Sequence, residues 1–178
     1  MKQLSLILVV AIALISCNKE DNPDTGNVDP EVYEIYKTLL MPLSSIQLIV
    51  SETAPNLNCA SLPANYYDTL GVAQAEIDQC KAVNANAYQL SPEAMSNIHT
   101  LISPEELEEL GWIEALEKYS AAGITNFGYP HFYDNDSKAI FELSYFCGGL
   151  CGSNEIIVME KTNGAWFKKH SVITSISK

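Results

Sequence analysis

The sequence contains no arginine, and its 10 lysines stand against 22 aspartates and glutamates, which gives a formal net charge of −12. Proteins that grip nucleic acids do so mainly by placing lysine and arginine on phosphates. We therefore expect no nucleic-acid partner for this chain. An acidic surface favours solubility and leaves a cationic ligand or Ca²⁺ open.

No apolar run is long enough to cross a membrane as a helix, which takes about 20 residues. The run from Leu4 to Ile15 follows Lys2 and is typical of a signal-peptide core. Its end, Leu14-Ile15-Ser16-Cys17, resembles the lipobox of bacterial lipoproteins, where the chain is cut before a cysteine that takes diacylglycerol on its sulfur. The resemblance implies a lipid anchor on Cys17 and an outer-membrane lipoprotein of the bacterial cell envelope.

A polar stretch follows the expected anchor. Lys19, Glu20 and Asp21 resemble the surface-export signal of some outer-membrane lipoproteins, and a soluble charged tether explains them equally well. The residues up to Asp29 cannot bury enough apolar surface to fold. We expect a signal peptide over residues 1–16, a lipidated flexible tether over 17–29 and a single domain over 30–178.

Four cysteines remain after the expected anchor: Cys59, Cys80, Cys147 and Cys151. An even number in an exported protein predicts disulfides. Four cysteines allow three pairings. Cys59–Cys80 with Cys147–Cys151 is the simplest, because each pair is local in the sequence.

Helix patterns dominate the first part of the expected domain. Asp29-Pro30-Glu31 is a helix start, and an apolar stripe follows it at helical spacing. Ser103 and Glu106 form a complete capping box around Pro104. Further helical patterns cover 72–83, start at 91 and continue over 112–119, whereas 45–50 has the pattern of a strand and 52–65 of a loop.

Strand patterns dominate from Gly123 onward. Phe141, Leu143 and Tyr145 alternate along one strand and share one face of it. Asn163-Gly164 predicts a type I′ hairpin turn before a last strand over 166–176. The chain is therefore expected to be α+β, with N-terminal helices packed on a C-terminal antiparallel β-meander of about four or five strands.

The last part of the chain carries a recurring pattern. Cys147-Gly148-Gly149-Leu150-Cys151-Gly152, an apolar strand, and then Lys161-Thr162-Asn163-Gly164-Ala165-Trp166 resemble bacterial envelope lipoproteins with a C-terminal CGxLCG … K-x-NG-x-W pattern. The residues 103–107 and 132–140 fit the same pattern. The resemblance implies an α+β domain with a C-terminal β-meander, and it implies no catalytic residue.

The Cys147–Cys151 loop has three interpretations. A thiol-redox pair is one, although redox enzymes of the thioredoxin kind use C-x-x-C at a helix N-terminus, whereas strands flank this loop. A metal site completed by His131 or His170 is another. The simplest is a disulfide that stiffens a hairpin tip, with glycines supplying the tight turns.

Other chemistry-bearing residues show no catalytic or metal motif. His99, His131 and His170 lack the paired spacing of metal sites, and no nucleophile elbow or P-loop is present. The glutamates of residues 105–109 are typical of a solvated helix edge. Residues 134–137 resemble a turn more than a Ca²⁺ loop. We expect no cofactor and no metal.

Aromatic residues offer the best candidate binding face: Tyr129, Phe132, Tyr133, Phe146 and Trp166. Aromatic side chains anchor protein partners and pack against flat ligands. The favoured hypothesis is a non-enzymatic binding or accessory module, held at the membrane, that contacts a protein or a glycan. A small thiol-redox or hydrolytic enzyme, or a protease-inhibitor or immunity-type lipoprotein, is the alternative.

Overall fold

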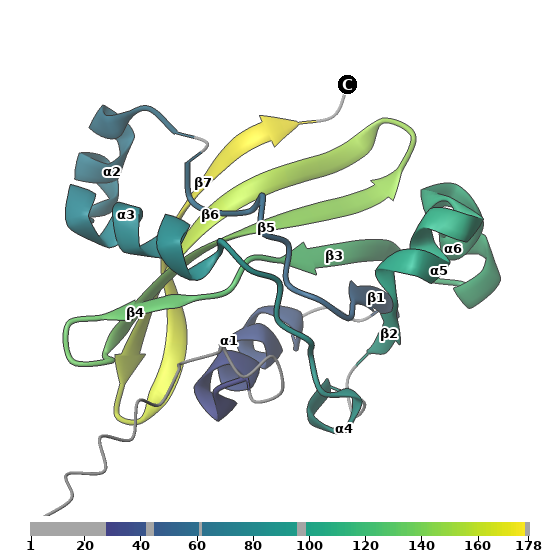
Figure 1. The fold of residues 1–178 in the computed structure, drawn as a ribbon, viewed down its shortest axis with the longest axis horizontal. Coiled ribbons are helices and arrows are strands. Elements are labelled where there is room, and N and C mark those ends of the chain that lie inside the picture. Colours follow the sequence, from purple (N-terminus) through teal and green to yellow (C-terminus); the bar gives the residue numbers. More distant parts are fainter. Residues whose placement is uncertain (1–27, 42–44, 61, 96–98, 177–178) are drawn as a thin grey trace, which may run out of the picture.

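The computed structural model describes residues 28–41, 45–60, 62–95 and 99–176 (Figure 1). Cys17, Lys19, Glu20 and Asp21 lie outside the described residues. The helices are α1 (Pro30–Leu40), α2 (Ala64–Leu70), α3 (Gln74–Val83), α4 (Pro92–Met95), α5 (Pro104–Leu110) and α6 (Trp112–Tyr119). The strands are β1 (Gln47–Val50), β2 (Thr100–Ile102), β3 (Gly123–Phe127), β4 (His131–Tyr133), β5 (Lys138–Gly148), β6 (Cys151–Thr162) and β7 (Ala165–Ile176).

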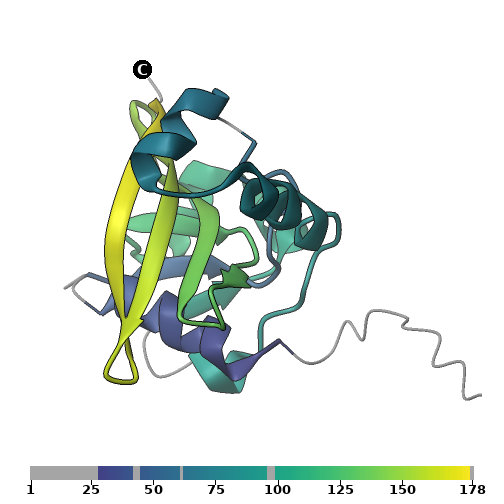
Figure 2. The ribbon, with the colours of Figure 1, turned by 90° about the vertical axis from the view of Figure 1, so that its left-hand side faces the viewer.

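One seven-stranded sheet organises the fold. Its strand order is β2-β1-β3-β5-β6-β7, and β4 pairs with β5 beside β3. The long strands β5, β6 and β7 form the expected antiparallel meander, which is seen side by side in Figure 2. β1, however, runs parallel to both β2 and β3. The fold is α+β as expected, but the sheet has more strands than expected and its helices are spread along the first two thirds of the chain.

Helix α1 packs on one face of the sheet, called the α1 face here. Asp29 caps its start by accepting a hydrogen bond from the Glu31 amide at 2.9 Å, as the sequence predicts. Its apolar stripe is buried against Phe141 and Leu143, which share that face with Tyr145. The expected alternation along β5 is thus confirmed. At the centre, the ring of Tyr36 stacks on Phe127 with centroids 4.0 Å apart.

The opposite face, called the α3 face, carries two separate apolar clusters. One packs α2 and α3 against Ile140, Ile156 and Val158. The other packs α5 and α6 against β1 and β3, with Ile124 at its centre. In Figure 1, α2 and α3 lie at the left of the sheet and α5 and α6 at its right, with the long strands between the two pairs. None of the described helices packs on the sheet between these two clusters.

Close backbone packing fixes the segment that links β1 to α2 across this sheet. Ala54 donates its amide hydrogen to the Phe127 carbonyl at 2.7 Å. A Cβ on Gly128 would lie 2.2 Å from the Leu57 carbonyl oxygen. Only glycine permits this approach, because the obstructing atom belongs to the backbone.

Two local predictions from the sequence have different outcomes. Asn163 and Gly164 both have positive φ, of 52° and 81°, as the type I′ turn requires. The capping box at α5 is only half made. Ser103 accepts from the Glu106 amide at 3.1 Å, but the Glu106 carboxylate turns to Lys118 and Tyr119 on α6.

Candidate functional site

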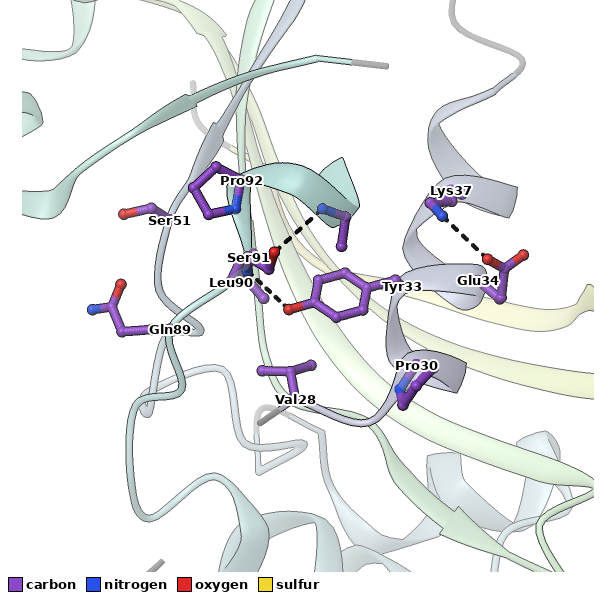
Figure 3. A pocket seen from close by; sticks show the side chains of 11 residues that line it. Val28, Pro30, Tyr33, Glu34, Lys37, Ser51, Gln89, Leu90, Ser91 and Pro92 are labelled. Atoms are coloured by element: carbon purple, nitrogen blue, oxygen red, sulfur yellow. Dashed lines mark hydrogen bonds and ion pairs between the residues drawn. The ribbon is translucent and has the colours of Figure 1, made fainter. Parts of the chain in front are cut away.

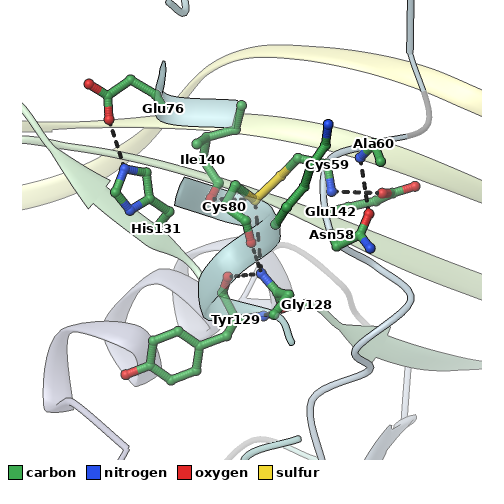
Figure 4. Close-up of a disulfide and its surroundings, with 12 residues drawn as sticks. Asn58, Cys59, Ala60, Glu76, Cys80, Gly128, Tyr129, His131, Ile140 and Glu142 are labelled. Carbon is green, nitrogen blue, oxygen red and sulfur yellow. Dashed lines mark hydrogen bonds and ion pairs between the residues drawn. A yellow bond between two sulfur atoms is a disulfide. The ribbon is translucent and has the colours of Figure 1, made fainter. Parts of the chain in front are cut away.

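The cysteines form the two local pairs expected from the sequence. Cys59–Cys80 joins the segment before α2 to α3, and Cys147–Cys151 closes the tip of the β5–β6 hairpin. Cys59 and Cys80 are completely buried. Figure 4 shows the Cys59 amide donating to the carboxylate of the buried Glu142, at 3.2 Å. This bridge is part of the core on the α3 face.

The hairpin tip is exposed and lies far from His131 and His170. Gly148 has a φ of 120°, and Leu150 between the two cysteines is 79% exposed. His131 pairs with Ile140 and His170 with Val158, each seven strand residues from the tip cysteines. Seven residues of strand span roughly 23 Å. Neither histidine can complete a metal site with these cysteines, and no other metal-holding cluster occurs in the described part of the chain.

The expected aromatic residues belong to three different clusters. Tyr129, Phe132 and Trp166 lie on the α1 face, where Phe132 and Trp166 have ring centroids 5.9 Å apart. Tyr133 packs with the α2–α3 cluster and Phe146 with the α5–α6 cluster. The structure therefore brings Phe132 and Trp166 together. It separates them from Tyr133 and Phe146.

Burial explains the roles of several of these aromatic residues. Trp166 is 4% exposed, and its Nε1 donates to Glu31 at 2.6 Å. The hydrogen bond from Lys161, followed by that from Trp166, lowers the pKa of Glu31. Burial raises the pKa of Tyr133 to about 12. Trp166 therefore offers little surface to a ligand.

A hollow of about 700 Å³ lies between α1 and the segment before α4 (Figure 3). Its polar groups are used within the protein. The Tyr33 hydroxyl accepts from the Ser91 amide at 2.8 Å, Ser91 donates its hydroxyl hydrogen to Glu93, and Lys37 pairs with Glu34. Because these groups already have partners, a ligand would gain little from them.

A row of small polar side chains crosses the uncovered part of the α3 face. Strand register places these residues directly opposite one another: Asn126 on β3, Ser144 on β5, Asn154 on β6 and Ser175 on β7. Directly opposed residues share one face of a sheet. Three inter-strand steps make this polar row roughly 14 Å long.

The polar row has unused hydrogen-bonding capacity. Among the described residues, the side chains of Ser144, Asn154 and Ser175 form no hydrogen bond. Asn126 Oδ1 is buried, and no described group donates to it. A buried acceptor without a partner costs about 1–3 kcal/mol.

Trp112 stands beside the polar row at the first position of α6. It is 40% exposed, and its ring packs edge-on against Phe146 with centroids 5.3 Å apart. Gly111, which joins α5 to α6, has a φ of 82°, in the region that favours glycine. The sharp joint directs the start of α6 toward the sheet.

Trp112 lines two separate hollows, which are together called the Trp112 groove here. One, of about 390 Å³, is lined by Asn126 and by Glu52 and Glu108 from the β1–α2 segment and α5. The other, of about 280 Å³, is lined by Phe146, Ser144, Asn154 and Ser175. Trp112 lines both. Because Asn126 and Ser144 are directly paired, the polar row is continuous from one hollow to the other.

An ion pair fixes the position of α6 relative to α5. Glu106 Oε1 accepts from Lys118 Nζ at 2.8 Å and from the Tyr119 hydroxyl. The hydrogen bond from Lys118, with that from Tyr119, lowers the pKa of Glu106. The two helices therefore hold Trp112 in place as one unit at neutral pH.

Comparison with known proteins shows no similarity: no protein-family model, curated protein or solved structure matches the chain. The described part of the chain has no helix with the length and apolar character of a membrane span. The Trp112 groove is not evident from the sequence. The polar row and Trp112 come from five elements, β3, β5, β6, β7 and α6, and the strand register shows that the residues of the row are neighbours.

Proposed function

We propose that this chain is a membrane-anchored binding module of the bacterial cell envelope, without catalysis of its own, which contacts a glycan or a protein through the Trp112 groove. The observation that carries the proposal is the polar row, whose hydrogen-bonding groups are unused in the described structure and lie beside an exposed tryptophan. Binding sites characteristically combine a concave, partly apolar surface with a few such polar groups.

The position of the groove suits a protein tethered by its N-terminus. The described chain enters at Val28 and α1, where Glu31 binds Lys161 at 2.7 Å near the β6–β7 turn. Asn154 lies seven residues along β6 from Lys161, which is roughly 23 Å. With a lipid on Cys17, the groove would therefore lie away from the entry of the tether and open toward the surroundings.

An inhibitor or immunity-type protein is the second candidate. Leu150 is 79% exposed at a hairpin tip closed by Cys147–Cys151. An exposed apolar residue on a stiff loop is a typical contact for a protein partner. A protein of this kind would lose its partner on Leu150→Asp and would keep it on Trp112→Ala, which is the reverse of the result we expect.

The anchor is tested by cell fractionation. Cys17→Ala should move the full chain from the membrane fraction to the soluble fraction, because the lipid is attached to that sulfur. A Cys147→Ala/Cys151→Ala variant is the matched control and should stay with the membrane. Membrane partition of Cys17→Ala equal to that of the wild type would refute the lipid anchor.

Surface exposure is tested separately on whole cells. Replacing Lys19, Glu20 and Asp21 with alanine should protect the chain from added protease if these residues direct export. Equal cleavage of both forms would show that the three residues are only a tether.

The binding function is tested with isolated envelopes. The full chain should be retained by envelope material, and Trp112→Ala should reduce retention. Phe167→Ala is the matched control, because Phe167 is 55% exposed on β7 at the far end of the sheet. Periodate treatment of the envelopes removes retention if the ligand is a glycan, and protease treatment removes it if the ligand is a protein. Retention of Trp112→Ala equal to the wild type would refute the groove as the binding site.

A further inference from the structure

The Trp112 groove has a restricted chemistry. Its polar row consists of two carboxamides and two hydroxyls, which both donate and accept hydrogen bonds and carry no charge. The charged residues that line the two hollows are Glu52 and Glu108, both at the Asn126 end. Glu52 already accepts from Gln89. The groove therefore offers many neutral hydrogen bonds and no cation for an anionic ligand.

The surroundings further disfavour an anionic ligand. The chain has a net charge of −12, and no lysine or histidine lines either hollow. A ligand with carboxylates or sulfates would be repelled without a counter-charge to bind it. A cationic ligand would meet carboxylates at one end and only neutral groups along the remaining three strands.

Peptides do not fit the recurring ways in which folded proteins bind them. Addition of a strand needs an unpaired sheet edge. The edge at β7 lies at the end of the polar row that is farthest from Asn126, and β5 and β6, which carry Ser144 and Asn154, are paired on both sides. An amphipathic helix needs an apolar groove, whereas this one has polar residues along its length. The hydrogen bonds that this groove offers to a ligand come from side chains of the polar row and not from the backbone of the strands.

Trp112 adds a flat apolar surface beside these hydrogen-bonding groups. An indole ring that is 40% exposed can pack against an apolar ring face, while the row bonds to groups at the ring edge. A sugar ring has both features, since its C–H groups form an apolar face and its hydroxyls surround it. A hollow lies on each side of Trp112, and the polar row is roughly 14 Å long, so the site has room for more than one ring.

We infer that the Trp112 groove binds an uncharged oligosaccharide laid across β3, β5, β6 and β7, with one sugar ring packed on Trp112 and its hydroxyls bonded to Asn126, Ser144 and Asn154. This inference rests on the proposed function and specifies its ligand. Asn126 lines the hollow on one side of Trp112, and Ser144 and Asn154 line the hollow on the other. Neighbouring rings occupy the hollows on either side.

The test uses the full chain in a detergent without a sugar headgroup, titrated with single sugars and hexasaccharides. The neutral set contains gluco-, manno-, galacto- and xylo-oligosaccharides of α and β linkage, and hexagalacturonate is the acidic comparison. The chain has two tryptophans, so Trp166→Phe leaves Trp112 as the reporter of fluorescence. Calorimetry of the unaltered chain gives the affinity independently.

At least one neutral hexasaccharide should bind, shift the Trp112 emission and bind more tightly than its single sugar. Trp112→Ala and Asn154→Ala should each weaken binding by about tenfold or more, as expected for residues at the centre of a binding site. Phe167→Ala should bind as the wild type does. Circular dichroism and thermal unfolding of each variant show whether it remains folded.

Other results separate this inference from the proposed function. If hexagalacturonate or a protein from the envelope binds in a Trp112-dependent way and every neutral sugar fails, the ligand class is wrong and the binding function stands. If a neutral sugar binds equally well to Trp112→Ala, the groove is the wrong site. If neither sugars nor envelope material depend on Trp112, both proposals are refuted.

Discussion

The two disulfides should stabilise the fold by different amounts, because they close loops of different length. Cys59 and Cys80 are 21 residues apart, whereas Cys147 and Cys151 are 4 apart. In the chain-entropy model a bridge restricts the unfolded chain more when its loop is longer, which gives about 3 kcal/mol for the first pair and about 2 kcal/mol for the second.

Burial increases the difference between the two. Cys59 and Cys80 are both 0% exposed within the α2–α3 cluster, whereas Cys151 is exposed at a hairpin tip. Replacing the buried pair by alanine also leaves unfilled space and lost contacts. We therefore expect Cys59→Ala/Cys80→Ala to lower the free energy of unfolding by about 3–5 kcal/mol. Cys147→Ala/Cys151→Ala should lower it by about 2 kcal/mol or less.

Guanidinium unfolding, followed by tryptophan fluorescence and circular dichroism, measures both values under one set of conditions. The wild type with its disulfides reduced is the control, since it loses the cross-links and keeps the sulfur atoms. It separates the loop contribution from the packing contribution. A tip variant destabilised as much as the buried variant would refute the reasoning that loop length and burial set these values.

Three further changes test other parts of the structure. Gly128→Ala should lower the melting temperature by several degrees, because its Cβ would meet the Leu57 carbonyl. Burial raises the pKa of Tyr133 from 10.0 to about 12, so its contribution to the free energy of unfolding should be complete below pH 10 and should fall as the pH rises toward 12. Tyr133→Phe should reduce that fall in an alkaline titration. Lys118 and Tyr119 lower the pKa of Glu106, so the stabilisation from these contacts is present above pH 4.5 and is lost in acid. Tyr119→Phe should therefore lower the free energy of unfolding more at pH 7 than at pH 3.

Local interactions explain which elements the sequence could predict. The α1 start depends on Asp29 and Pro30, and the β6–β7 turn on Asn163 and Gly164, all within a few residues of the structure they specify. The disulfide pairing was also predicted correctly, because each cysteine pairs with its neighbour in the sequence. The capping box was only half right, since Glu106 gains more from two partners on α6 than from the start of its own helix.

Non-local pairing explains what the sequence did not reveal. β2 is three residues long and exists through its parallel pairing with β1, about fifty residues earlier. α2 begins at the end of the expected loop over 52–65 and continues through residues to which the sequence pattern assigns no element, and it has no side-chain cap. For the same reason, neighbouring aromatic residues did not define a single face. Phe132 and Tyr133 are adjacent in β4 and so point to opposite faces of the sheet.

The polar row is the clearest case, because its residues have no pattern in the sequence. Along the sequence, Asn126 and Ser175 are about fifty residues apart, with β4, β5 and β6 between them. Each resembles an ordinary surface position by itself. Their alignment depends on the register of three antiparallel pairs and on the bulge between Asn154 and Glu155. A site of this kind can be recognised only once the register is known.

Asn126 distinguishes a functional row from one that merely supports the fold. Its Oδ1 is buried and, among the described residues, without a donor, which costs about 1–3 kcal/mol in the free protein. Leucine has nearly the same shape and no polar atoms, so Asn126→Leu should raise the free energy of unfolding by about 1 kcal/mol while it weakens ligand binding. Denaturant unfolding and the envelope-retention assay, performed on the same preparation, measure the two effects. If Asn126→Leu is less stable and binds as the wild type does, Asn126 serves the fold. If the variant is more stable and binds more weakly, the free protein tolerates an unfavourable residue because its ligand requires it.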